Sequence, residues 1–143
     1  MSWPLYRGED IGGLLPQREP FLMVDVLYGC TIAGCCTGYG IRRDDIFCDG
    51  MLFSAEGIIE HIAQSGSLLL GYNAVEKGLQ APLGYIGEIK KFSLVQHPRS
   101  GQSLSTHVNV DKELDGIYLM SAETMVKNAS IAQCRMKLSL VRS

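Results

Sequence analysis

A short polar group inside an apolar stretch of the chain has the residue types needed for acid–base chemistry. Within GIIEHIAQSG (residues 57–66), Glu60, His61 and Gln64 stand among isoleucines. A carboxyl group can transfer a proton during a reaction, and an amide one helical turn further on can orient it through a hydrogen bond. The same residues also suit the solvated side of a helix. Periodicity alone favours the solvated interpretation.

The helix that holds these residues is predicted over residues 55–77. Ser54 can cap its first turn, and Gly78 can end it in the left-handed conformation. One side of the helix is apolar and is expected to face a core, with four buried residues: Ile58, Ile59, Ile62 and Leu69. A second stripe consists of Glu56, Glu60, Gln64, Ser67 and Gly71.

The remainder of the chain predicts strands that surround this helix. Two strands are expected before the helix and four after it, over residues 21–30, 33–41, 84–95, 104–111, 116–126 and 131–140. Because no second helix is predicted to cover another face, the strands should be antiparallel. We therefore expect one α+β domain spanning residues 1–143, with a six-stranded sheet around one long helix. Residues 42–52 are polar and predict an irregular loop.

Composition excludes several classes of function. The net charge is −2, and the 13 Lys and Arg residues are scattered, so no nucleic-acid partner is expected. Neither a signal peptide nor a membrane span is predicted, which makes the cytoplasm the expected location. The five cysteines form no CxxC pair, and the three histidines do not complete a ligand pattern, so neither a metal nor a cofactor is expected. We interpret the cysteines as small buried apolar residues.

Three segments together resemble the FabZ-type 3-hydroxyacyl-acyl-carrier-protein dehydratases. LLPQREPFLMVDVL is similar to the family's LPHR-x-PFLLVD opening, and IIEHIAQSGSLL to the E-A-x-A-Q segment of its central helix. QHPRSGQSLSTHVNV is similar to the R-P-V-x-P-G-D-x-L stretch that leads into a family strand. The segments follow the family order and spacing over nearly the whole chain. The nearest resemblance is to a divergent FabZ-like branch associated with aryl-polyene-type lipid clusters.

The resemblance implies a hot-dog fold and a dehydratase (lyase) of fatty-acid or polyene-lipid synthesis. Its substrate would be an acyl thioester on acyl carrier protein or coenzyme A. The catalytic carboxylate would be Glu60, facing a tunnel at the interface of a homodimer or higher oligomer. The implied substrate-binding residues are Gln64 and the first-turn residues Ala55, Glu56 and Gly57, whose amides can hold the thioester carbonyl. His97 and Arg99 are the candidates for the tunnel mouth.

Two departures from the family motifs keep other functions open. The family's catalytic His lies fourteen residues before the Glu, and that count reaches Ile46 here, while the His of LPHR is replaced by Gln17. The chain could therefore be a slow dehydratase, a non-catalytic partner subunit of an active dehydratase, or a hot-dog acyl thioesterase.

No other residue clearly replaces the missing His. His61 is expected at an interface or on the surface, because neighbouring helix positions point about 100° apart and it cannot easily share a target with Glu60. His107 is expected to be solvated on the polar face of a strand. One aspartate of the 42–52 loop could act as a base, although a loop this polar is usually solvated; the candidates are Asp44, Asp45 and Asp49.

Overall fold

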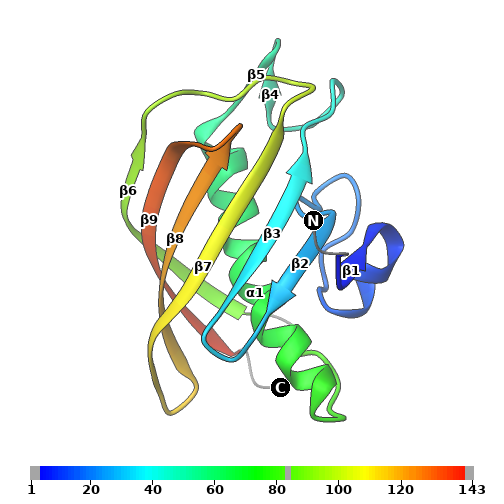
Figure 1. The fold of residues 1–143 in the computed structure, drawn as a ribbon, viewed down its shortest axis with the longest axis vertical. Coiled ribbons are helices and arrows are strands. Elements are labelled where there is room, and N and C mark those ends of the chain that lie inside the picture. Colours follow the sequence, from blue (N-terminus) through cyan, green and yellow to red (C-terminus); the bar gives the residue numbers. More distant parts are fainter. Residues whose placement is uncertain (1–3, 83–84, 141–143) are drawn as a thin grey trace.

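A strongly bent antiparallel sheet wraps around one long helix in the computed structural model, which describes residues 4–82 and 85–140 (Figure 1). The helix α1 spans Ala55–Glu76. The sheet has the strand order β1-β2-β3-β7-β8-β9-β6. Its strands are β1 (Tyr6–Arg7), β2 (Val26–Cys30), β3 (Gly34–Gly40), β6 (Tyr85–Leu94), β7 (Ser103–Leu114), β8 (Ile117–Val126) and β9 (Ala129–Leu140). A 3-10 helix, η1 (Gly8–Gly13), follows β1.

The predicted α+β class and the antiparallel sheet are confirmed, whereas the number of strands is wrong by one. Tyr6 and Arg7 pair with Leu27 and Val26, which adds β1 at the edge of the sheet. Two residues make a strand too short for its alternation to be recognised in a sequence. The predicted start of β6, Gly84, lies outside the described residues.

The segment predicted as an irregular loop contains a short hairpin. Strands β4 (Cys48–Asp49) and β5 (Leu52–Phe53) pair just before α1. Gly50, between them, has a φ of 62°, which is the left-handed conformation that glycine tolerates best. The loop is therefore more ordered than its polar composition indicates.

Local sequence explains where α1 begins and ends. Ser54 Oγ accepts a hydrogen bond from the Gly57 amide at 3.1 Å, as an N-cap should. The helix ends at Glu76, and Gly78 follows with a φ of 78°, so the left-handed stop lies where it was predicted.

Most of the predicted apolar face of α1 is buried against the concave side of the sheet. Ile58, Ile62 and Leu69 are buried, while Ile59 is only half-buried, so that part of the prediction is wrong. A Cβ at Gly66 would lie 2.7 Å from Met136 Cε, which shows how closely helix and sheet approach. Each large aliphatic side chain buried here contributes about 1.5 to 3 kcal/mol.

The second stripe of α1 is not a solvated surface. Gln64, Ser67 and Gly71 are buried, because the segment between η1 and β2 covers this side of the helix. The covering segment includes Leu14, Leu15 and Met23, all buried, and Ile11 of η1 is buried as well. Toward the N-terminal end of the stripe, Glu56 is exposed and Glu60 is half-buried. The polar side of the helix thus opens gradually toward its N-terminus.

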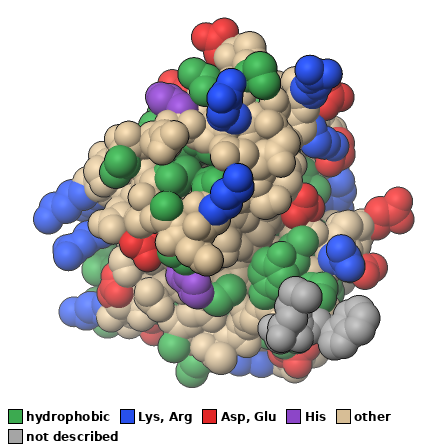
Figure 2. All heavy atoms as spheres, turned by 45° about the horizontal axis from the view of Figure 1, so that its top comes forward, with side chains coloured by type: hydrophobic (Ala, Val, Ile, Leu, Met, Phe, Trp, Pro, Cys, Tyr) green, Lys and Arg blue, Asp and Glu red, His purple; other side chains and the backbone are tan. Residues whose placement is uncertain are grey.

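The surface mixes charges of both signs. Figure 2 shows Lys and Arg side chains interspersed with Asp and Glu side chains on the face that it displays. Among the described residues, no helix is both long and apolar enough to cross a lipid bilayer. Two cysteines are buried as expected, Cys35 and Cys134, whereas Cys30, Cys36 and Cys48 are only partly buried.

Candidate active site

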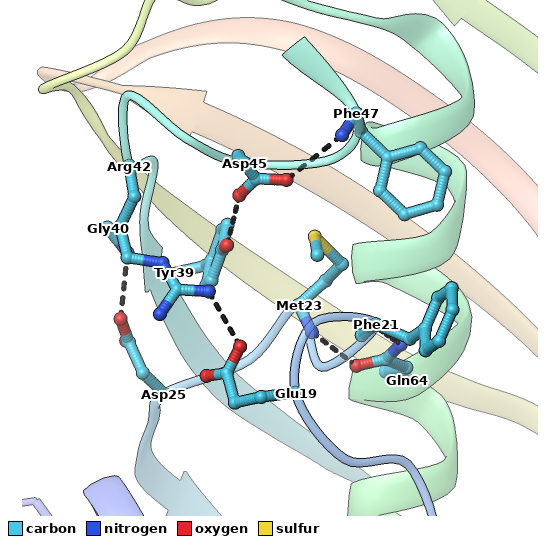
Figure 3. A network of polar contacts seen from close by, with 10 residues as sticks. All are labelled: Glu19, Phe21, Met23, Asp25, Tyr39, Gly40, Arg42, Asp45, Phe47 and Gln64. Carbon is cyan, nitrogen blue, oxygen red and sulfur yellow. Dashed lines mark hydrogen bonds and ion pairs between the residues drawn. The ribbon is translucent and has the colours of Figure 1, made fainter.

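The side chain of Gln64 joins α1 to the segment that covers it. Its Oε1 accepts a hydrogen bond from the Met23 amide at 2.7 Å, and its Nε2 donates to the Phe21 carbonyl at 2.9 Å (Figure 3). The same Nε2 donates to Glu60 Oε2 at 2.9 Å. With three bonds made and only 1% of the residue exposed, the amide has one available orientation.

Glu60 is therefore held at one carboxyl oxygen by a rigid neighbour. The residue is half-buried, and Gln64 lies one helical turn after it. The hydrogen bond fixes one side of the carboxyl group, while its other oxygen, Oε1, accepts no hydrogen bond from the part of the chain that the structure describes. A positioned carboxyl group with one free oxygen is what proton transfer to or from a substrate requires.

His61 is neither on the surface nor at an interface of this chain, which corrects the prediction. The residue is fully buried; its Nδ1 donates to the Met23 carbonyl at 2.7 Å, and its Nε2 accepts from Thr106 Oγ1 at 2.7 Å. Thr124 Oγ1 lies 2.8 Å from Thr106 Oγ1 and completes the chain of hydrogen bonds. Burial lowers the pKa of His61 to about 4, so the imidazole is neutral at pH 7.

Gln64 and His61 together fix the backbone of Met23 from both sides. Gln64 binds its amide, and His61 binds its carbonyl. The segment around Met23 was predicted to be part of a strand that begins at residue 21. Its backbone groups pair with helix side chains instead, and β2 begins only at Val26.

The N-terminus of α1 offers fewer free amides than predicted. The Gly57 amide already donates to Ser54 Oγ, and a Cβ at Gly57 would lie 2.6 Å from Phe53 Cζ. Gly57 is thus packed closely and its amide is engaged by the N-cap, while its role in substrate binding stays a prediction. The amides of Ala55 and Glu56 precede the first intrahelical hydrogen bond and remain the better candidates.

His97 and Arg99 lie beside the start of α1, and their place at a tunnel mouth stays a prediction. His97 Nδ1 donates to the Phe53 carbonyl at 2.9 Å, and the Phe53 amide donates to the Pro98 carbonyl at 2.8 Å. Arg99 is exposed and forms an isolated bridge with Leu52. Both residues adjoin the β4–β5 hairpin, and among the described residues no hydrogen bond joins either of them to Glu60.

Asp45 is buried, which contradicts the expectation of a solvated loop. One of its oxygens accepts a very short hydrogen bond from the Tyr39 hydroxyl, and the other accepts from the Phe47 amide at 3.2 Å (Figure 3). Burial and the neighbouring Asp45 carboxylate raise the pKa of Tyr39. With both oxygens engaged, Asp45 holds the loop and is poorly placed to act as a base. Ile46, at the position of the family's His, is 46% exposed.

A cleft of about 540 Å³ lies next to this loop. Its walls include Val24, Asp25, Tyr39 and Arg42. Asp25 Oδ2 accepts from the Gly40 amide at 3.0 Å, and burial raises the pKa of this carboxyl group. Arg42 is paired with Glu19 at 2.6 Å in an exposed ion pair.

Sequence reasoning singled out Glu60 and Gln64, whose hydrogen bond the structure shows, but it missed the residues that support them. The role of His61 could not be inferred, because its partners Met23 and Thr106 are 38 and 45 residues away. Tyr39 had a recognisable signal, since Cys35, Thr37 and Tyr39 alternate toward the helix, and all three are buried. Asp44 and Asp49 are exposed.

The antiparallel sheet wrapped around one long helix, with a carboxylate held on that helix, defines a protein of the hot-dog class. Solved structures support this fold. A chain of the dehydratase heterocomplex ApeI:P from Xenorhabdus doucetiae superposes with a TM-score of 0.82 at 13% identity, covering 100% of this chain and 94% of that chain.

More distant structures share the fold as well. A sigma28-regulated virulence protein from Campylobacter jejuni has a TM-score of 0.71 at 9% identity, covering 93% of this chain and 96% of that one. Thioesterase superfamily member 2 from Mus musculus has a TM-score of 0.59 at 10% identity, covering 78% and 77%. At these identities the likeness establishes the fold alone.

The chain belongs to the ApeP-like family, described as ApeP dehydratase, which it matches over residues 9–140. The earlier resemblance to dehydratases is thereby confirmed at the level of the dehydratase family. No curated protein sequence gives a significant match.

Proposed function

We propose that this protein acts on 3-hydroxyacyl thioesters as a FabZ-like dehydratase subunit and uses Glu60 as its proton-transfer group. The substrate would be carried by acyl carrier protein or coenzyme A and would belong to fatty-acid or polyene-lipid synthesis. The observation that supports the proposal most directly is the hydrogen bond from Gln64 to Glu60. It holds a half-buried carboxyl group in one orientation on the central helix.

The reaction assigns a specific task to Glu60. Dehydration removes a proton from C2 of the substrate and releases the C3 hydroxyl as water, with a double bond left between the two carbons. Glu60 would deliver the proton to the departing hydroxyl and accept one in the reverse hydration. The amides of Ala55 and Glu56 would hold the thioester carbonyl, whose oxygen gains negative charge when the C2 proton leaves.

The group that would accept the proton from C2 is unassigned among the described residues. Ile46 cannot accept a proton, Asp45 is engaged on both oxygens, and His61 is enclosed in the core. The loss of one proton-transfer group typically slows a reaction by roughly 100- to 10,000-fold. The isolated chain should therefore be slow, and a partner subunit that supplies this group should restore the rate.

This reasoning favours a second candidate, in which the chain is a non-catalytic subunit that stabilises an active dehydratase. The replaced His supports it, and the similar ApeI:P structure is by its name a dehydratase heterocomplex. The two candidates differ in one respect. Only in the first does Glu60 of this chain contribute to the rate of the assembled complex.

The decisive experiment compares products and variants. The purified protein is incubated with 3-hydroxyacyl- and crotonyl-acyl carrier protein, alone and together with an active dehydratase of the same organism, and the acyl groups are analysed by mass spectrometry. Hydration or dehydration that depends on Glu60 supports the leading proposal. Activity that is unchanged by Glu60→Gln in the complex supports the non-catalytic role, and release of free acid would identify a thioesterase instead.

A further inference from the structure

Two cysteines face each other across the β2–β3 hairpin. Cys30 and Cys35 are direct cross-strand partners, separated in sequence only by residues 31–34 of the turn. Both thiols point toward α1: Cys30 Sγ lies 3.9 Å from the Leu69 carbonyl, and Cys35 Sγ lies 3.6 Å from the Ser65 carbonyl. Side chains directly opposite on one face of an antiparallel pair have Cβ atoms about 4.5 to 5.5 Å apart.

We propose that Cys30 and Cys35 form a reversible disulfide when the protein meets a small-molecule disulfide such as oxidised glutathione. A disulfide needs Cβ atoms about 3.5 to 4.5 Å apart and Cα atoms about 4.4 to 6.8 Å apart. A directly opposed cross-strand pair satisfies the second distance and needs only a small approach for the first. The geometry of the pair therefore allows a disulfide bond.

The surroundings of the two thiols differ in a way that sets the order of reaction. Cys30 is partly exposed, whereas Cys35 is buried. Contact with the Cys30 thiol, followed by burial, raises the pKa of Cys35. Cys30 is thus the thiol that an external disulfide can reach, and Cys35 is the resolving thiol behind it.

The thiol–disulfide exchange takes place in two steps. The Cys30 sulfur, as thiolate, attacks one sulfur of the small disulfide, whose S–S bond breaks and releases one small thiol with the proton that Cys30 gave up. The Cys35 sulfur then attacks Cys30 in the mixed disulfide, the Cys30–Cys35 bond forms, and the second small thiol leaves with the proton from Cys35. The two protein thiols lose two electrons and two protons, and the small disulfide is reduced to two thiols.

The position of the pair connects it to a cavity at the C-terminal half of α1. Asn73 on the helix donates from Nδ2 to the Thr31 carbonyl at 3.0 Å, so the hairpin turn lies beside this part of α1 (Figure 1). Ile32, Leu69 and Asn73 line a cavity of about 550 Å³. Cys30, whose Sγ lies 3.9 Å from the Leu69 carbonyl, is therefore next to a residue that lines this cavity.

Cys36 provides a matched control. It follows Cys35 directly, but its thiol faces the opposite side of the sheet, 3.1 Å from His107 Nδ1. It cannot reach Cys30 without a change of register, because successive residues of a strand point to opposite faces. All three cysteines lie in one tryptic peptide, residues 19–42, so variants are needed to tell their pairings apart.

The test treats the folded protein with oxidised glutathione, alkylates the remaining thiols under denaturing conditions, and measures the mass of peptide 19–42. In the wild-type protein and in Cys36→Ser we expect a loss of about 2 Da relative to the unoxidised thiols, with Cys30 and Cys35 both protected from alkylation. Dithiothreitol should reverse the change. Cys30→Ser and Cys35→Ser should each abolish it.

Two results would contradict the proposal. In one, oxidised Cys36→Ser keeps two alkylatable thiols at positions 30 and 35. In the other, it stops at a stable glutathione adduct on Cys30 while Cys35 stays free. The Cys36→Ser protein keeps both cysteines of the pair, so its result does not depend on whether Cys35→Ser folds.

Discussion

Gln64 donates one hydrogen bond to Glu60 while its other polar contacts hold the backbone of the segment that covers α1. The three contacts measure 2.9 Å to Glu60 Oε2, 2.7 Å to the Met23 amide and 2.9 Å to the Phe21 carbonyl. A single side chain therefore connects the orientation of the candidate catalytic carboxyl group to the position of the covering segment. Loss of the contacts to the covering segment should therefore also change the orientation of Glu60.

Replacing Gln64 by Leu should reduce both stability and activity. The Met23 amide and the Phe21 carbonyl would lose their partners in a buried region, at a cost of about 2 to 4 kcal/mol in the free energy of unfolding. Denaturant unfolding measures the stability, and hydration of crotonyl-acyl carrier protein measures the activity. Gln80→Leu is the control, because Gln80 is exposed beyond the end of α1 and should change neither. Equal effects of the two substitutions would show that Gln64 has no special role.

Replacing Glu60 by Gln should separate chemistry from folding. A Gln side chain can still accept the hydrogen bond from Gln64 but cannot transfer a proton, so any dehydratase activity should fall by roughly 100- to 10,000-fold. The free energy of unfolding should change by less than about 1 kcal/mol, since no buried partner is lost. Glu56→Gln, one turn earlier and exposed, is the matched control and should keep activity within a few-fold. If both variants keep their activity, Glu60 is only the polar edge of a core helix.

The sequence predicted the fold well because its evidence is local. The alternation of Leu104, Thr106 and Val108 and the signals at Ser54 and Gly78 depend on neighbouring residues alone, and the structure confirms each of them. The extra strand β1 was missed because two residues carry no recognisable period. The family resemblance added the hot-dog arrangement, which periodicity could not provide.

The site was harder to predict because its contacts join distant parts of the chain. The polar stripe of α1 looked solvated, yet the covering segment buries Gln64 and Ser67. His61 looked like a surface residue because nothing near it in sequence reveals its hydrogen bonds to Met23 and Thr106. A helix wheel separates polar from apolar residues, but it cannot show which polar residues have partners inside the fold.

His61 should make the protein less stable as the pH falls. The folded state holds its pKa at about 4, below the usual value of about 6.5, so the unfolded chain binds more protons between these values. The stabilisation is complete above pH 6.5 and decreases toward pH 4; between pH 7 and pH 5 the loss is about 2 kcal/mol. Denaturant unfolding at both pH values measures it.

The matched variants isolate this effect from the titration of carboxylates. His61→Gln lacks the titrating group, so its stability should fall by about 2 kcal/mol less than that of the wild type over the same interval. His107→Gln replaces an exposed histidine and should follow the wild type. If the free energy of unfolding changes equally with pH in the wild type and in His61→Gln, then His61 is not a buried neutral imidazole in the protein in solution.

Replacing Gly71 by Ala should destabilise the protein even though Ala favours helices by about 1 kcal/mol. A Cβ at this position would collide with the backbone carbonyl of Leu14, so the covering segment or the helix must shift, at a cost of about 1 to 3 kcal/mol. Thermal unfolding measures the change. Gly13→Ala is the control, because a Cβ there has nothing within 4 Å. A Gly71→Ala protein as stable as the wild type would show that the covering segment does not pack on α1 this closely.

The last prediction concerns assembly, on which the proposed site at a subunit interface depends. Strand β6 is at one end of the sheet and pairs only with β9 among the described strands, which leaves its other edge open to a second chain. On the helix, Ile59 and Ala63 are only half-buried on the same side as Glu60, which suits a surface covered by a neighbouring subunit. We therefore expect at least a homodimer, measured by light scattering at micromolar concentration. Ile59→Lys should weaken the assembly because it places a charge in that surface, whereas Ile32→Lys, at a 74% exposed position in the turn between β2 and β3, should not. A wild-type protein that is monomeric and yet fully active as a dehydratase would contradict the placement of the site between subunits.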